Sequence, residues 1–127
     1  MINSLLAISV GASLGAIMRW GFMSQMNHWL PGLPLGTLSA NLLGSYLVGV
    51  AIALFALQQS LAPEWRLLVV VGFLGSLTTF SGFSAEVIQL IQQEKLLWAV
   101  TTIGAHTLGA LLMTFLGLLT VQMLQRA

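Results

Sequence analysis

Residues 72–83, GFLGSLTTFSGF, combine glycines, hydroxyl side chains and two phenylalanines within a hydrophobic stretch that is long enough to cross a membrane. Gly72 and Gly75 weaken a helix, and the serine and threonine hydroxyls around them can hydrogen-bond backbone groups that a break would free. Unwound backbone at membrane depth is tolerated only where it is buried in protein or lines a water-filled cavity. Carbonyl groups at such a break often coordinate cations, so this segment is the first candidate for an ion site.

A pair of phenylalanines and a carboxylate follow the expected break at helical spacing. Phe80 and Phe83 are three residues apart and share one face of a helix, with Glu86 a turn further on. Asn41 lies inside the preceding hydrophobic stretch, with Ser45 on the same face four residues later. A buried amide at that depth either joins helices or lines a polar path, and the phenylalanines either pack or face that path.

Two other polar side chains occur in hydrophobic stretches, and each has two interpretations. Arg19 lies near the end of the first stretch, where it either snorkels to the interface or attracts anions at an entrance. His106 shares a helix face with Thr102 and Gly109. It is either a hydrogen-bonded packing residue or a titrating relay.

The composition indicates a protein solvated by lipid. Of 127 residues, 57% are hydrophobic and only 6% are charged, whereas soluble domains carry about 25% charged residues. The net charge of +1 excludes a basic face for nucleic acid, and the absence of cysteine excludes disulfides and thiol chemistry. Two histidines and three carboxylates leave little for acid–base or metal catalysis, so we do not expect an enzyme.

Four hydrophobic stretches are long enough to span a bilayer, which takes about 20 mostly apolar residues. The runs NHWLPGLP and QQSLAPEW and the polar turn QQEK separate them. We predict an all-α membrane protein with one four-helix transmembrane domain, residues 1–127, whose third helix is broken near its middle. The expected spans are roughly 3–26, 36–57, 65–91 and 97–124.

The positive charges are split evenly between the two sides of the membrane. Arg66 and Arg126 fall on the side of the termini and the second connection, and Arg19 and Lys95 fall on the other. An excess of Lys and Arg on one side orients a membrane chain, and this chain has no excess. Either so few charges give a noisy count, or the chain inserts both ways and pairs as an antiparallel homodimer of dual topology. We favour the dimer, because four short helices can hardly enclose a polar pathway.

Taken together, these residues resemble the Fluc/CrcB family of small fluoride channels. The similarity runs over the whole chain, through GASLGAIMRW, GTLSANLLGSYLVG, GFLGSLTTFSGFSAEV and HTLGALLMTFLG in the four expected helices. Its specific part is the glycine-rich break followed by T-T-F-S-x-F, combined with an Asn in the preceding helix and an Arg in the first.

The resemblance implies a fluoride-selective channel that exports toxic fluoride passively across the bacterial inner membrane. It implies an antiparallel homodimer with two pores, each faced by Phe80 of one subunit and Phe83 of the other. Asn41 would contribute a side-chain amide donor to the pore. A structural sodium ion at the dimer centre would be held by the backbone carbonyls of Gly75 and Thr78.

The resemblance also implies a polar track beyond the phenylalanines that involves Ser81 and Thr114. It places Glu86 near one pore end and Arg19 at the vestibule. Two departures from the family pattern each remove a hydroxyl from this track: Gly82 stands where a Thr is usual, and Ala110 stands where a Ser is common.

The alternative from the residues is a proton-coupled small multidrug exporter, which is also short, four-helical and capable of dual topology. Such an exporter needs a membrane-embedded carboxylate, typically in its first helix. This chain has no acid there, and Glu86 in the third span is the one candidate. A membrane subunit that only packs against larger partners is a further alternative, but it has no reason to gather the break, the Phe pair and a buried Asn at one depth.

Overall fold

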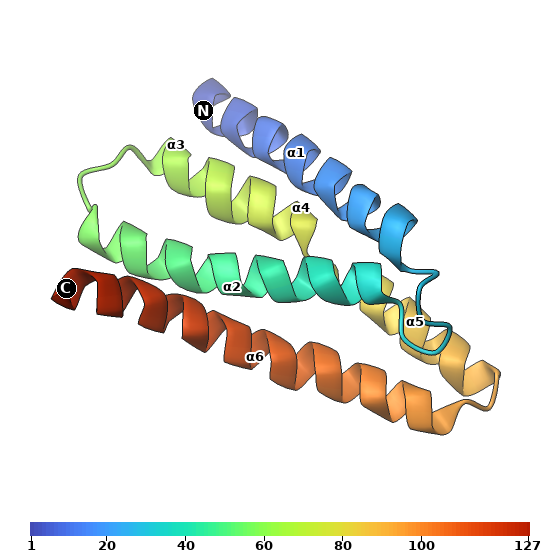
Figure 1. Ribbon diagram of the computed structural model, residues 1–127. Coiled ribbons are helices and arrows are strands. Elements are labelled where there is room, and N and C mark those ends of the chain that lie inside the picture. Colours follow the sequence, from blue (N-terminus) through green and yellow to red (C-terminus); the bar gives the residue numbers. More distant parts are fainter.

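Four helical segments that are long and apolar enough to cross a membrane make up most of the chain (Figure 1). The computed structural model describes residues 1–127 and contains no strand. The segments are α1 (Ile2–Met26), α2 (Leu35–Leu57), a third segment over Pro63–Gln92, and α6 (Leu96–Arg126). The prediction of an all-helical chain with four candidate membrane spans is therefore confirmed.

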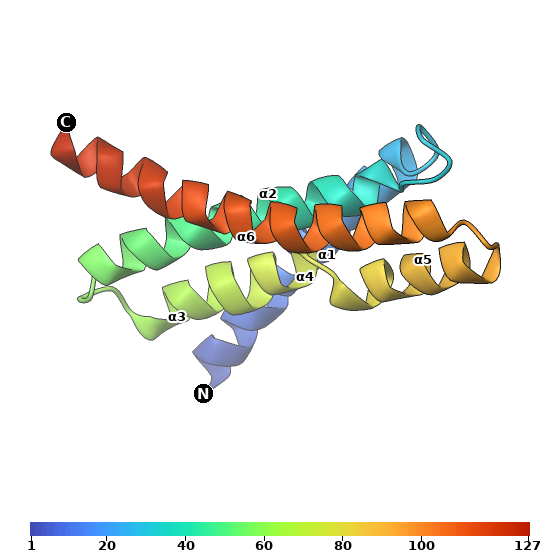
Figure 2. The ribbon, with the colours of Figure 1, turned by 90° about the horizontal axis from the view of Figure 1, so that it is seen from below.

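The third segment consists of four consecutive elements. They are α3 (Pro63–Arg66), the π-helical η1 (Leu67–Leu74), α4 (Gly75–Leu77) and α5 (Phe80–Gln92). The two residues between α4 and α5, Thr78 and Thr79, have extended backbone conformations. Figure 2 shows this thin connection between the end of α4 and the start of α5.

Thr79 has the backbone and side chain needed to start a new helix. Its φ of −145° and ψ of 114° are extended, and its hydroxyl accepts a hydrogen bond from the N–H of Gly82 at 2.9 Å. A threonine that accepts from the third residue of the following helix is a standard N-cap, because the first N–H groups of a helix lack partners within it. The hydroxyl of Thr79 thus provides a hydrogen-bond partner for one of the first N–H groups of α5.

Small residues bring the helices into two close pairs. α2 and α6 lie side by side, and α1 packs on η1 (Figures 1 and 2). A Cβ atom on Gly49 of α2 would collide with the carbonyl oxygen of Thr114, and one on Gly11 of α1 would collide with that of Leu68. Backbones approach this closely in membranes because glycine leaves no side chain between them.

The interior of the protomer is thin. The buried hydrophobic cluster at its centre contains Ala40, Ala51, Leu74 and Leu77. Large apolar side chains cover the outside of all four spans, with Leu14 at 56% exposure and Leu108 at 69% as examples. An apolar surface of this extent needs lipid or a protein partner to cover it.

Replacing Gly49 by alanine should lower the stability of the protein by about 2 kcal/mol, because overpacking of a close contact typically costs 1–3 kcal/mol. The added methyl group meets the backbone of α6 at Thr114, which cannot rotate away. The thermal midpoint in detergent, followed by size-exclusion chromatography after heating, measures the change. Gly104→Ala is the matched control, since nothing lies within 4 Å of its added Cβ. Equal midpoints for the two variants would contradict the close contact.

Candidate functional site

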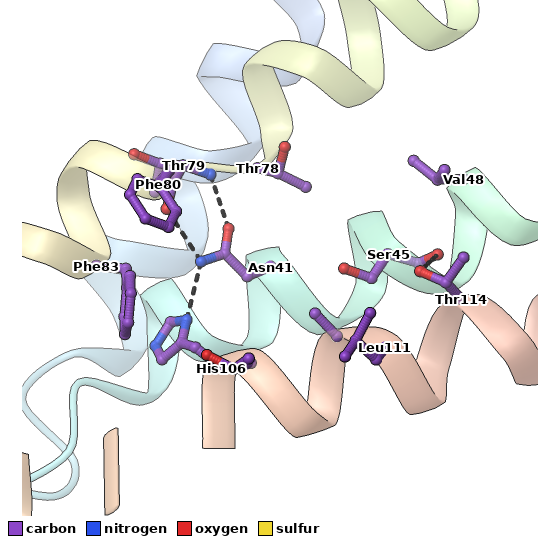
Figure 3. A pocket seen from close by; sticks show the side chains of 12 residues that line it. Asn41, Ser45, Val48, Thr78, Thr79, Phe80, Phe83, His106, Leu111 and Thr114 are labelled. Atoms are coloured by element: carbon purple, nitrogen blue, oxygen red, sulfur yellow. Dashed lines mark hydrogen bonds between the residues drawn. The ribbon is translucent and has the colours of Figure 1, made fainter. Parts of the chain in front are cut away.

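An open groove of about 430 Å³ lies between the connection from α4 to α5, the middle of α2 and the middle of α6 (Figure 3). Twelve residues line the groove, and none of them is Lys, Arg, Asp or Glu. Its polar lining residues are Asn41, Ser45, Thr78, Thr79, His106, Thr107 and Thr114. The groove therefore offers neutral hydrogen-bonding groups and aromatic rings rather than fixed charges.

The side chain of Asn41 binds both backbone groups of Thr79. Its Nδ2 donates to the Thr79 carbonyl at 3.1 Å, and its Oδ1 accepts from the Thr79 N–H at 2.7 Å. The amide thus pairs with an extended residue as a neighbouring β-strand would. Asn41 is 9% exposed and Thr79 is 8% exposed, and both backbone groups of Thr79 would otherwise be buried without partners.

Asn41 also binds α6 through His106. Its Nδ2 lies 2.9 Å from Nδ1 of His106, as the dashed lines in Figure 3 trace. Both N–H donors of the amide are therefore used within the protomer, one by Thr79 and one by His106. Sequence reasoning identified Asn41 and its face of α2 but did not pair it with either residue.

The two phenylalanines at the start of α5 lie together, but their environments differ. The ring centroids of Phe80 and Phe83 are 5.6 Å apart with the rings tilted by 60°, a favourable geometry for an aromatic pair. Phe80 is 81% exposed on the surface of the protomer. Phe83 is partly buried and packs on the imidazole of His106, with centroids 4.7 Å apart. Both rings line the groove.

Two hydroxyl residues expected on a polar track occupy different positions. Thr114 lines the groove from α6, and its hydroxyl donates to the carbonyl of Ser45 at 3.1 Å. Ser81 is exposed and does not line the groove, and its hydroxyl lies 3.3 Å from that of Thr79. Ser81 therefore reaches the connection through Thr79 within this protomer.

Glu86 lies outside the groove and is tied to the beginning of α2. Its Oε1 accepts a hydrogen bond from the hydroxyl of Thr37, and its Oε2 is buried without a partner. The backbone N–H of Thr37 donates to Oδ1 of Asn27 at 2.9 Å. Thr37 is four residues before Asn41, so the two carry their partners on the same face of α2. The spacing Thr37, Asn41 and Ser45 is a signal in the sequence from which Thr37 could have been found.

Arg19 contacts the backbone at the end of α4. Its Nε donates to the carbonyl of Ser76 at 2.9 Å, and the hydroxyl of Ser76 donates back to the carbonyl of Ala12 in α1 at 2.8 Å. Arg19 does not line the groove of the protomer. Its guanidinium satisfies a carbonyl that the end of the helix leaves free.

The carbonyls of Gly75 and Thr78 are suited to a cation. In a continuous helix each would accept from the N–H four residues later. The N–H of Thr79 donates instead to Asn41, and that of Gly82 donates to the Thr79 hydroxyl. Oxygen donors without helical partners are the ligands that a hard cation such as sodium takes at a broken helix. The chain contains no cluster of three or more His, Asp or Glu side chains that would offer a different kind of metal site.

Comparisons with known proteins agree on one family. Residues 6–118 match the model of the family described as CrcB-like protein, Camphor Resistance (CrcB). The chain is 56% identical over 127 residues, the full length of both chains, to a protein of Tolumonas auensis named fluoride-specific ion channel FluC. Proteins with the same name from Pseudomonas putida and Nitrosomonas europaea are 55% identical over 120 residues, 94% of each chain, and 50% identical over 121 residues, 95% of each chain.

Replacing Asn41 by leucine should lower stability by about 3 kcal/mol or more, because it leaves several buried groups unpaired at 1–3 kcal/mol each. The N–H and C=O of Thr79 lose their partner together with Nδ1 of His106. Hydrogen exchange of a peptide covering residues 78–83, read by mass spectrometry, should accelerate most in this segment. Gln89→Leu is the matched control, since Gln89 is exposed on α5. Unchanged exchange in the Asn41 variant would contradict the role of the amide.

Proposed function

The chain belongs to the CrcB-like family, and from that membership we propose that it is a fluoride-selective channel through which fluoride leaves the cell passively. It is a multi-pass protein of the bacterial inner membrane, and its relatives are named as ion channels rather than enzymes. The observation that carries the proposal is the neutral groove beside the connection from α4 to α5, whose lining holds hydrogen-bond donors and aromatic rings but no charged side chain. The identity of the ion rests on the names of the relatives.

A neutral groove suits conduction of a small, strongly hydrated anion. The ion loses water on entry and needs donors at short range to replace it. Hydroxyl and N–H groups and the positive edges of the rings of Phe80 and Phe83 can provide them. A fixed positive charge would hold the ion more strongly and slow its departure, whereas conduction requires binding that is weak enough to release it.

The working unit of this proposal is an antiparallel homodimer with two pores. The groove is open on one side, and Phe80 is 81% exposed at its edge, so a single protomer does not enclose a path. A second copy would cover this side, and each pore would then be faced by Phe80 of one subunit and Phe83 of the other. The even distribution of Lys and Arg supports insertion in both orientations.

A structural sodium ion at the dimer centre is part of the proposal. The carbonyls of Gly75 and Thr78 would hold it, because both have lost their helical donors to Asn41 and to Thr79. When bound, the ion would supply positive potential near the two grooves and offset the negative ends of the carbonyl dipoles. The protein's own contribution is to keep those carbonyls free.

We assign the remaining residues to different positions along the path. Thr114 and Ser81 would form a polar track, with Ala110 and Gly82 each removing one hydroxyl from it. Glu86 would stand near one pore end, and Arg19 would add positive charge at the vestibule. The membrane potential and the ionisation of HF in the cytoplasm would drive the export of fluoride.

Vesicles that contain the purified protein should release fluoride but not chloride when valinomycin carries potassium out, as a fluoride electrode records. Asn41→Asp should reduce the rate about 100-fold or more, because two charges a few ångströms apart at an effective dielectric near 20 repel by about 4 kcal/mol. Phe80→Ile should reduce it strongly by removing a ring edge from the path. Phe115→Ile is the matched control, since Phe115 is 56% exposed on α6 away from the groove. Release of organic cations driven by a proton gradient, without fluoride leak, would overturn the proposal.

Replacing sodium by N-methyl-D-glucamine should lower the thermal midpoint of the detergent-purified protein. A ligand that binds only the folded state stabilises it by about 2.7 kcal/mol at 100 times its dissociation constant. The thermal midpoint in potassium should lie below that in sodium. The midpoint of the Asn41→Leu variant should not depend on the cation, because this variant loses the ordered connection between α4 and α5. Identical midpoints in all three salts would exclude a cation at the carbonyls of Gly75 and Thr78.

A further inference from the structure

His106 is a buried side chain inside the groove that the proposed path has not used. It is 4% exposed, and its imidazole lies between the amide of Asn41 and the ring of Phe83 (Figure 3). Nδ1 is 2.9 Å from Nδ2 of Asn41. The other ring nitrogen, Nε2, is buried and has no hydrogen-bond partner.

The contacts of Asn41 determine which ring nitrogen carries the proton. The Asn41 oxygen must face the N–H of Thr79 and its nitrogen must face the carbonyl of Thr79, because the reverse orientation would oppose two donors and two acceptors. The atom that meets His106 is therefore an amide nitrogen, which can only donate. Nδ1 accepts this hydrogen bond, so the imidazole is neutral and its proton is on Nε2.

One side-chain N–H donor in the groove has no hydrogen-bond partner. Only Asn41 and His106 among the lining residues have such donors. Both N–H groups of Asn41 are used by Thr79 and His106. The Nε2–H of His106 alone is free, and buried polar groups are bonded so generally that an exception requires an explanation.

We propose that the Nε2–H of His106 is the N–H donor that a fluoride ion meets as it passes Phe83, and that Asn41 serves this donor by holding the imidazole in the required tautomer. The proposal rests on the proposed function. It assigns the N–H donor that contacts the ion to His106 instead of to the side-chain amide of Asn41. The hydrogen bonds run in one direction, from Thr79 N–H to Asn41 and from Asn41 to His106, so each polarises the next and strengthens the terminal donor. Phe83 lines the groove and its ring centroid lies 4.7 Å from that of the imidazole, so an ion that passes Phe83 comes close to the His106 ring.

A small anion is the ligand that fits this nitrogen. A neutral imidazole whose Nδ1 already accepts a hydrogen bond has no lone pair left for a cation, and Nε2–H can only donate. The other buried side-chain atom without a hydrogen-bond partner is Oε2 of Glu86, and no hydrogen bond joins it to His106. A fluoride ion would accept a short, charge-assisted hydrogen bond from Nε2–H.

Two substitutions separate the donor from the acceptor of His106. His106→Asn can place an oxygen near the position of Nδ1 to accept from Asn41, but it has no donor at the position of Nε2. His106→Gln can place an N–H near the position of Nε2, but it leaves Asn41 without its acceptor. We expect His106→Asn to lower fluoride flux about tenfold or more while its thermal midpoint stays near that of the parent protein. His106→Gln should keep more flux with a lower midpoint. The opposite order would assign His106 only to positioning Asn41 and overturn the proposal.

Direct observation of the donor uses protein in detergent that is labelled with ¹⁵N in its histidine and asparagine residues and is titrated with potassium fluoride. The chain has two histidines, and His28→Gln removes the signal of the other, which is exposed in the connection between α1 and α2. A saturable shift of the His106 Nε2–H signal with fluoride but not with chloride, with an ¹⁵N–¹⁹F coupling across the hydrogen bond, supports the proposal. A shift of the Asn41 amide with an unmoved His106 signal overturns it. If vesicles with the parent protein leak fluoride, but the His106 signal does not shift and the His106 variants keep the parent flux, this inference alone is overturned. If vesicles with the parent protein do not leak fluoride, the proposed function is overturned.

Discussion

The paired hydrogen bonds between the amide of Asn41 and the backbone of Thr79 are the interaction on which the rest of the site depends. They hold one residue of the third membrane segment in an extended conformation where a helix would otherwise continue. Because the Thr79 N–H points to Asn41, the carbonyl of Gly75 is free, and because Thr79 caps α5, the N–H of Gly82 is withdrawn from Thr78. The same amide fixes the tautomer of His106. A single side chain from α2 therefore determines the free carbonyl of Gly75 and the free N–H donor of His106.

The cost of unpaired backbone in lipid explains why so many side chains gather at this connection. Each polar backbone group without water must find a partner inside the protein. Asn41 and the Thr79 hydroxyl provide three of these partners, and Arg19 takes the carbonyl of Ser76. Asn41, Thr79 and Arg19 are thus occupied with the connection itself. The groups left unpaired, at Gly75, Thr78 and His106, are those to which we assign the proposed contacts with ions.

A single protomer leaves its groove open on one side. Its core is thin, its apolar side chains face outward, and Phe80 projects from the start of α5. Lipid can cover the apolar surfaces, but it cannot satisfy an open groove lined by hydroxyl and amide groups. This mismatch between a polar groove and an apolar surrounding is the physical argument for a second copy, and it agrees with the even distribution of positive charge along the sequence.

The sequence by itself determined the class of protein and its four helices that are long and apolar enough to cross a bilayer, because helix length and the scarcity of charge are local properties that a bilayer imposes on any chain. It also identified Asn41, the Phe pair and the glycine- and threonine-rich segment as the features that distinguish these spans from ordinary apolar helices. It could not assign partners, because the contacts of Asn41 with Thr79 and His106 join residues 38 and 65 positions apart. Nothing in LLVVVGFL distinguished the π-helical η1 from an α-helix. Only the tertiary structure decided that both N–H groups of Asn41 are hydrogen-bonded within the protomer and that the Nε2–H of His106 has no partner. The direction of a hydrogen bond depends on which groups the packing brings together.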